Sequence, residues 1–109
     1  MKIDTRSQGF RTTTALSAHV EREVRKSLSG VRPRPEAVLA SLSDVNGPRG
    51  GDDKRCQLRG RLPRAGEVVA SAAHADMYQA IAQAADRFRR ALVRRSGPRQ
   101  TSRRRRIQA

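Results

Sequence analysis

The segment from Arg55 to Leu62 alternates without a fault between two kinds of side chain, and this feature most constrains the fold. The residues of one set are apolar or small: Cys56, Leu58, Gly60 and Leu62. The residues of the other set are polar and mostly basic: Arg55, Gln57, Arg59 and Arg61. Because successive side chains of a strand point to opposite sides, the alternation predicts a strand with one buried face and one cationic face. The rest of the chain must therefore cover one face of a sheet.

Three further segments have the composition of strands: residues 1–6, 36–45 and 67–73. Residues 46–53, NGPRGGDD, are rich in turn formers and predict a loop, so the strands before and after them form a hairpin. Residues 63–66, PRAG, predict a tight turn into the last strand.

The first of two predicted helices follows the Thr-Thr-Thr run at 12–14, which supplies an N-cap. Its apolar side chains recur at every fourth position: Leu16, Val20, Val24 and Leu28. This spacing places them on one side of an α-helix, with Arg22, Arg25 and Lys26 on the other. Gly30 and Pro33 end the helix, since Gly suits the left-handed C-terminal position and Pro cannot continue the hydrogen-bond ladder.

The second helix begins after Asp76, a capping residue, and is expected to run for about five turns. Its apolar stripe consists of Met77, Ile81, Ala84, Ala85, Phe88 and Leu92. Arg87, Arg90 and Arg94 fall on the far side of this helix. The predicted order is therefore β-α-β-β-β-α, an α+β fold in which two helices pack on one face of a small, mostly antiparallel, four-stranded sheet.

The charge of the chain indicates a polyanionic partner. Its 109 residues carry a formal net charge of +14, and residues 87–109 hold ten Arg and no acidic residue. Five of the basic residues follow Ser96, so residues 1–96 keep a charge of +9. We expect one folded domain at 1–96 and a disordered, Arg-rich tail at 97–109, because the tail cannot bury enough apolar area to offset its conformational entropy. Nucleic acid is the first candidate partner, and an anionic membrane is the second.

Catalytic and metal chemistry have little support in the sequence. Cys56 is the single cysteine, which excludes an internal disulfide. It belongs to the apolar set of the alternating strand, so we expect it to be a small core residue. His19 and His74 are far apart in sequence and are expected to face solvent. No signal peptide or membrane-spanning run is visible, so we expect a cytoplasmic protein.

One segment resembles a known family. Residues 67–82, EVVASAAHADMYQAIA, contain a strand that ends in Ala-Ser-Ala, a short gap, and then Asp-Met-Tyr-x-Ala-Ile at the start of the last helix. This order is similar to the signature of the ribosome hibernation-promoting factor and ribosome-associated inhibitor family. The Thr-x-Ala-Leu at 13–16 is similar to the start of the first helix in that family. The resemblance covers residues 1–96 and is to the short form, without the second domain of long members.

The resemblance implies the same β-α-β-β-β-α fold, a relative of double-stranded-RNA-binding domains. It also implies a translation inhibitor that binds the small ribosomal subunit and its rRNA in the mRNA and tRNA channel and protects idle ribosomes in stationary phase or stress. No catalysis and no cofactor are implied, and we expect a monomer off the ribosome. The chain differs from the family in its charged loop at 46–53, its preference for Arg over Lys, and its Arg-rich tail.

The candidate RNA-binding residues are the cations of the two helices and of the alternating strand: Arg22, Arg25, Lys26, Arg55, Arg59, Arg61, Arg87, Arg90, Arg94 and Arg95. The alternative interpretation is that these side chains are only solvent-exposed charges on the surface and do not bind RNA. Tyr78 either stacks on a base or packs against the rim of the sheet, and we favour packing. At the level of function, the alternative is a general basic RNA-binding protein or RNA chaperone that is not specific to ribosomes.

Overall fold

The computed structural model describes residues 1–44 and 54–108, with side chains described to residue 95. Four strands form one sheet, in the order β1-β2-β3-β4: β1 (Lys2–Gln8), β2 (Ala37–Asp44), β3 (Lys54–Leu62) and β4 (Gly66–His74). β1 pairs with β2 in parallel, and the other two pairings are antiparallel. The predicted α+β class, element order and mostly antiparallel sheet are confirmed.

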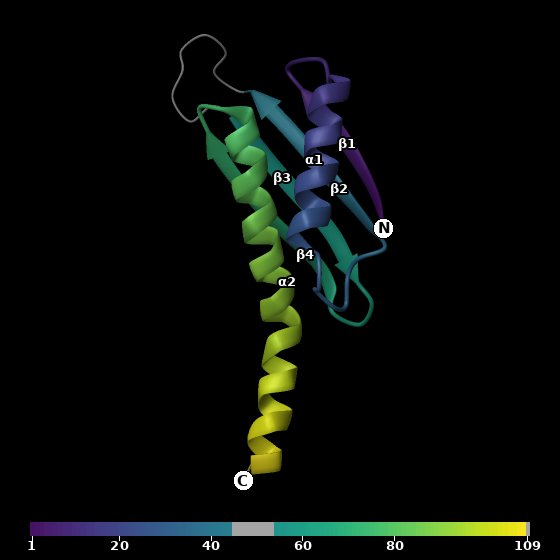
Figure 1. Cartoon of the computed structure of the whole chain (residues 1–109), viewed down its shortest axis with the longest axis vertical. Coiled ribbons are helices and arrows are strands. Elements are labelled where there is room, and N and C mark those ends of the chain that lie inside the picture. The colour runs from purple at the N-terminus through teal and green to yellow at the C-terminus, as the bar shows by residue number, and fades with distance from the viewer. Residues whose placement is uncertain (45–53, 109) are drawn as a thin grey trace.

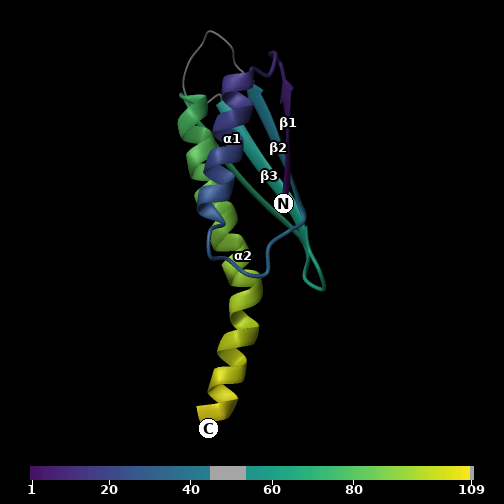
Figure 2. The same ribbon diagram turned by 45° about the vertical axis from the view of Figure 1, so that its right-hand side comes forward.

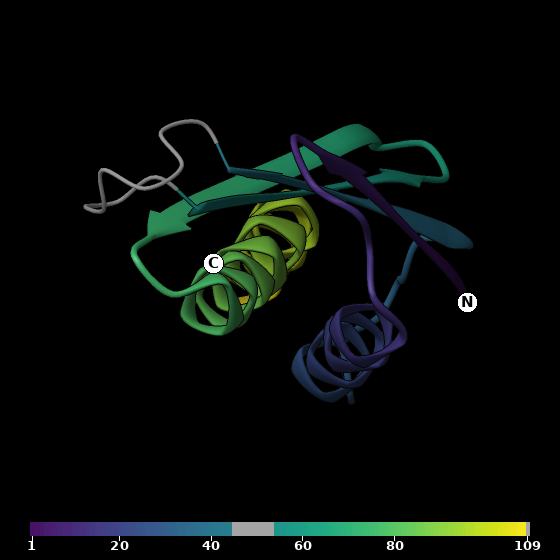
Figure 3. The same ribbon diagram turned by 90° about the horizontal axis from the view of Figure 1, so that it is seen from above.

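The two helices, α1 (Thr14–Ser27) and α2 (Met77–Gln108), lie side by side on one face of the sheet, as Figure 3 shows. The opposite face of the sheet is left uncovered in all views (Figures 1 and 2). This arrangement explains the alternation in β3, because its apolar set points towards the helices and its polar set points away.

The N-termini of both helices are capped as predicted. The hydroxyl of Thr13 accepts a hydrogen bond from the backbone N–H of Leu16 at 3.1 Å. The carboxylate of Asp76 accepts one from the backbone N–H of Tyr78 at 3.0 Å. Each bond satisfies one of the amide donors that the first turn of a helix leaves unpaired.

The core lies between the helices and the sheet and is built mainly from aliphatic side chains. The predicted stripe of α2 is buried along its whole length, and Val20, Val24 and Leu28 of α1 are buried with it. Leu16 is only partly buried at the edge of this cluster. Phe88 is the one aromatic ring in the buried core of the described residues, and it contacts β3 where Gly60 leaves room. A Cβ on Gly60 would lie 3.0 Å from the Cβ of Pro35 and 3.1 Å from the ring of Phe88.

The end of α2 differs from expectation. The sequence predicts that the helix ends near Ser96, whereas it continues to Gln108 and projects beyond the sheet (Figures 1 and 2). Arg and Gln are good helix formers, so residues beyond 98 can extend a helix that the packed residues have already nucleated. The division into a folded domain and a tail stays a prediction. The loop predicted at 46–53 lies outside the described residues.

Candidate nucleic-acid interface

The cations predicted on the alternating strand lie on the uncovered face of the sheet. Three arginines of β3 are exposed: Arg55, Arg59 and Arg61. The alternate residues Cys56, Leu58 and Gly60 are buried against the helices. The carboxylate of Glu67 on β4 lies 3.8 Å from Arg59, and both side chains are about half exposed. Arg55 and Arg61 have no ion-pair partner among the described residues. The open face is thus positively charged, with Arg59 partly neutralised.

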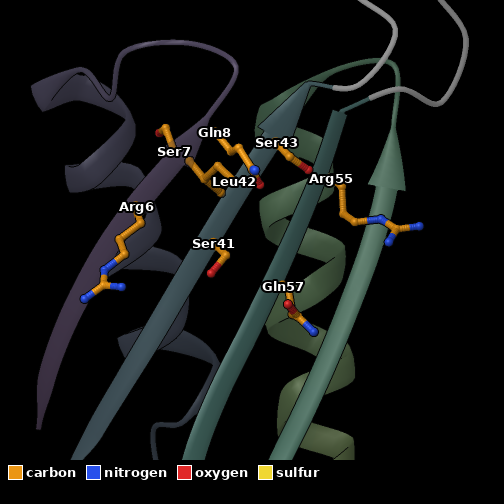
Figure 4. A pocket seen from close by; sticks show the side chains of 8 residues that line it. All are labelled: Arg6, Ser7, Gln8, Ser41, Leu42, Ser43, Arg55 and Gln57. Atoms are coloured by element: carbon orange, nitrogen blue, oxygen red, sulfur yellow. The ribbon is translucent and has the colours of Figure 1, made fainter.

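The strand register adds residues to this face beyond the cations that the sequence analysis singled out, and it places some of them beside Arg55. Arg6 on β1 lies beside Ser41 on β2, which lies beside Gln57 on β3. A second row consists of Gln8, Ser43 and Arg55. These side chains surround a shallow hollow of about 460 Å³ at one end of the sheet (Figure 4).

The cations of α1 lie on the covered side of the molecule, on the outer surface of that helix. Arg25 pairs with Glu21 at 3.1 Å and also donates to the carbonyl of Met1 at 3.0 Å. Lys26 lies 4.0 Å from Glu23. These contacts lie on an exposed surface, where such pairs contribute little to stability and leave the cations free to exchange partners.

The cations of α2 differ from one another in what they contact. Arg87 donates to the carbonyl of Ser71 at 2.9 Å, and Arg95 donates to the carbonyls of Ala65 and Glu67, the latter at 3.2 Å. All three acceptors belong to β4 or to the turn before it, so these two guanidinium groups lie along the free edge of the sheet. Each guanidinium has five donors, and the contacts use only one or two of them.

The other two cations predicted on α2 do not contact the sheet. Arg90 pairs with Asp86 one turn earlier on the helix. Arg94 has no hydrogen bond or ion pair among the described residues. The ten predicted residues therefore do not converge on one site. They form a helical surface and an open-sheet surface on opposite sides of the molecule, with Arg87 and Arg95 at the β4 edge.

Tyr78 and His19 contact each other between the two helices. The centroids of their rings are 4.7 Å apart in an edge-to-face arrangement, so Tyr78 contacts α1, while 43% of its surface stays exposed. That it packs instead of stacking on a base stays a prediction. The expectation that His19 faces solvent is wrong, because its Nε2 is buried and its Nδ1 lies 3.4 Å from Arg22. His74 is half-buried, and its Nδ1 accepts a hydrogen bond from the backbone N–H of Asp76 at 2.9 Å.

Cys56 is fully buried in the core, as predicted. Burial raises the pKa of its thiol from 9.0 to about 12, because the apolar surroundings penalise the thiolate. The thiol is therefore a packing group. Residues 1–44 and 54–95 contain no cluster of three His, Cys, Asp or Glu side chains suited to a metal ion.

The fold and its surfaces define a small, basic α+β domain with cations on both faces. The chain belongs to the sigma 54 modulation protein / S30EA ribosomal protein family, whose model matches residues 3–100. This is a family of ribosome-associated factors and not of enzymes. The resemblance seen in the Ala-Ser-Ala and Asp-Met-Tyr motifs is therefore confirmed.

Two solved structures share the fold. The N-terminal domain of Protein Y from Thermus thermophilus is 24% identical with a TM-score of 0.70, over 86% of this chain and 98% of that one. A ribosomal subunit interface protein from Coxiella burnetii is 18% identical with a TM-score of 0.74, over 89% of this chain and 99% of that one. No curated protein sequence matches the chain. Within the part of the chain that the structure describes, no helix has the length and apolar character needed to cross a membrane.

Proposed function

We propose that this protein is a translation inhibitor that binds the small ribosomal subunit, occupies its mRNA and tRNA channel, and stabilises idle ribosomes in stationary phase or stress. The observation that carries the proposal is the family match over residues 3–100. The structural relative from Coxiella burnetii is itself described as a ribosomal subunit interface protein. A ribosomal partner would place this protein in the cytoplasm.

The distribution of charge supports binding inside a channel. Cations lie on the outer surface of the helices and on the open face of the sheet, which point in opposite directions (Figure 3). A channel in the small subunit would have rRNA on both sides of a bound protein, so each charged surface would meet phosphate. A protein that binds one side of an RNA duplex needs only one such surface.

The proposed rRNA contacts are the ten predicted cations: Arg22, Arg25, Lys26, Arg55, Arg59, Arg61, Arg87, Arg90, Arg94 and Arg95. Phosphate contacts of this kind fix position and supply affinity that falls with salt. Arg94, which has no partner among the described residues, and Arg55 and Arg61 on the sheet lose no intramolecular ion pair when they bind phosphate. Arg87 and Arg95 can keep their bonds to β4 and contact RNA with their remaining donors.

Competition with initiator tRNA tests the proposed position on the small subunit. Purified subunits are saturated with the protein and then titrated with labelled initiator tRNA and mRNA. We expect the protein to be displaced as tRNA binds, with one copy bound per subunit at the start. Full occupancy of both on the same subunit would contradict channel binding.

The second candidate function is general RNA binding without ribosome specificity, which the high net charge alone would support. The two candidates differ in selectivity. A general binder has similar affinity for any polyanion of equal length, whereas the proposed function requires a preference for the small subunit over unstructured RNA at the same salt concentration.

A further inference from the structure

The uncovered face of the sheet carries a hollow whose lining includes only one of the ten predicted cations, Arg55. Its described lining comes from three neighbouring strands: Arg6 and Gln8 of β1, Ser41 and Ser43 of β2, and Arg55 and Gln57 of β3. The side chains of Arg6 and Arg55 lie on opposite sides of a floor of hydroxyl and amide groups, and their guanidinium groups point outward from it (Figure 4). Since β1 and β3 are two strands apart and Arg6 and Arg55 lie in neighbouring rows, their backbones are about 12 Å from each other across the sheet.

The charges around this hollow are unbalanced. Neither the side chain of Arg6 nor that of Arg55 has a hydrogen bond or ion pair among the described residues. The acidic side chains of the open face, Asp4 and Glu67, lie in other rows of the sheet, and Glu67 is paired with Arg59. An ion pair joins Asp44 and Lys54 at 3.2 Å at this end of the sheet. By the alternation of β2 and β3, these two side chains belong to the helix-covered face and not to the open face. Two exposed cations therefore flank a polar floor, and no carboxylate of residues 1–44 or 54–95 lies between them.

We propose that this hollow is a binding site for the phosphodiester backbone of single-stranded RNA. Arg6 and Arg55 would each bind a phosphate, and the hydroxyls of Ser41 and Ser43 and the side-chain amide of Gln57 would donate hydrogen bonds to the phosphate and ribose oxygens between them. The inference rests on the proposed function and deepens it, because it names the ligand of the open face and adds Arg6, Ser41, Ser43 and Gln57 to the residues that would bind it there.

The residues of the hollow also determine how RNA would be bound. Sheets that recognise single-stranded RNA by base stacking do so with aromatic side chains on the open face. The three aromatic residues of this chain are Phe10, Tyr78 and Phe88, and none of them lies on the four strands. We therefore expect this face to contact the phosphate and ribose groups of RNA. The affinity should then depend little on the base sequence and fall with increasing salt concentration.

The test uses the full chain, labelled with ¹⁵N and titrated with a uridine oligonucleotide of about ten nucleotides. We expect the largest NMR shifts at Ser41, Ser43 and Gln57. The variant Arg6→Gln/Arg55→Gln should lose these shifts, and the slope of log affinity against log salt should fall in magnitude by roughly 1.4 to 1.8, at about 0.7 to 0.9 per phosphate. Circular dichroism should show that this variant is folded, since both side chains are exposed.

The matched control is Arg32→Gln/Arg34→Gln, which removes the same charge from exposed positions before β2. It should keep the shifts on the open face. Equal loss in both variants would show that only net charge matters and would overturn the proposal. Stronger shifts with a polyglutamate peptide of equal charge would also overturn it, in favour of an acidic protein partner.

Sedimentation of the same variants with ribosomes separates this inference from the proposed function. If the wild-type chain binds the oligonucleotide through the hollow but does not bind ribosomes, the proposed function fails and the site stands. If the wild-type chain binds ribosomes and Arg6→Gln/Arg55→Gln binds both ligands as well as wild type, the site fails and the proposed function stands.

Discussion

Arg87 of α2 donates a hydrogen bond from Nη1 to the backbone carbonyl of Ser71 on β4, at 2.9 Å. Arg95, two turns later on the same helix, makes the equivalent contact with Glu67. The outer edge of β4 would otherwise present unpaired carbonyls to another strand. The two arginines thus cover part of this edge while they anchor the helix.

Removal of the Arg87 contact should lower stability more than removal of a neighbouring cation. We expect Arg87→Ala to reduce the free energy of unfolding by about 1 kcal/mol, because a charge-assisted hydrogen bond to the backbone is lost. Arg90→Ala loses only an exposed pair with Asp86 on the same helix and should cost less than about 0.5 kcal/mol. Urea denaturation of both variants measures the difference. Equal values would show that the Ser71 contact contributes nothing particular.

Gly60 should not tolerate a side chain. Gly60→Ala places a methyl group about 3 Å from Pro35 and Phe88, both buried, and should destabilise the fold by about 1 to 3 kcal/mol. Combining it with Phe88→Leu should cost less than the sum of the two single changes, since the smaller side chain relieves the contact. Thermal or urea unfolding of the four proteins tests this. Strict additivity would contradict the close packing of Gly60 and Phe88.

The buried thiol predicts a specific pH dependence. With the pKa of Cys56 raised to about 12, the folded state holds its proton between pH 9 and 12 while the unfolded state releases it. The unfolded state binds fewer protons there, so this group makes stability fall as pH rises through that range and has no effect below it. Cys56→Ala should be less sensitive to pH than wild type above pH 9 in urea denaturation. In the folded wild type at pH 8, the thiol should resist alkylation that proceeds readily in urea; rapid alkylation without urea would contradict the burial.

The tail and the helices are predicted to contribute differently to RNA binding. Deleting residues 97–109 should leave a folded domain that still binds ribosomes, because the last buried side chain of the described core is Leu92. If the five arginines of the tail contact phosphate, the deletion should reduce the magnitude of the salt slope by roughly 3.5 to 4.5, at about 0.7 to 0.9 per phosphate. Replacing Arg87, Arg90 and Arg94 with Gln should instead remove the preference for ribosomes over unstructured RNA, since a packed helix presents cations in fixed geometry. The variants are titrated with ribosomes and with unstructured RNA at several salt concentrations. If only the tail deletion lost the preference for ribosomes, the tail and not the helix would supply selectivity.

The local patterns of the sequence were sufficient to predict the fold. The alternation at 55–62 and the stripe from Met77 to Leu92 each depend on residues close in sequence, and the structure confirms both. The hollow depends on which strands are neighbours. Arg6 belongs to β1, and it approaches Gln57 of β3 only because β1 pairs in parallel with β2, a pairing that no local pattern specifies.

The contacts of α2 were not predictable for a related reason. The helical spacing places Arg87 and Arg94 away from the apolar stripe, which indicated exposed cations in general. It does not show that a guanidinium group reaches around to the edge of β4, because that depends on the position of the helix across the sheet. The extension of α2 beyond Ser96 was missed because Gly97 and Pro98 normally end a helix, whereas the helix continues through them.

Sedimentation with ribosomes tests the central claim most directly. The full chain is mixed with purified ribosomes and separated subunits at moderate salt and centrifuged through a sucrose gradient, with an unstructured RNA of equal charge as competitor. We predict that the protein travels with the small subunit and with whole ribosomes, at about one copy each, and that the competitor does not remove it. Protein that remains at the top of the gradient, or that moves to the competitor RNA, would contradict the account.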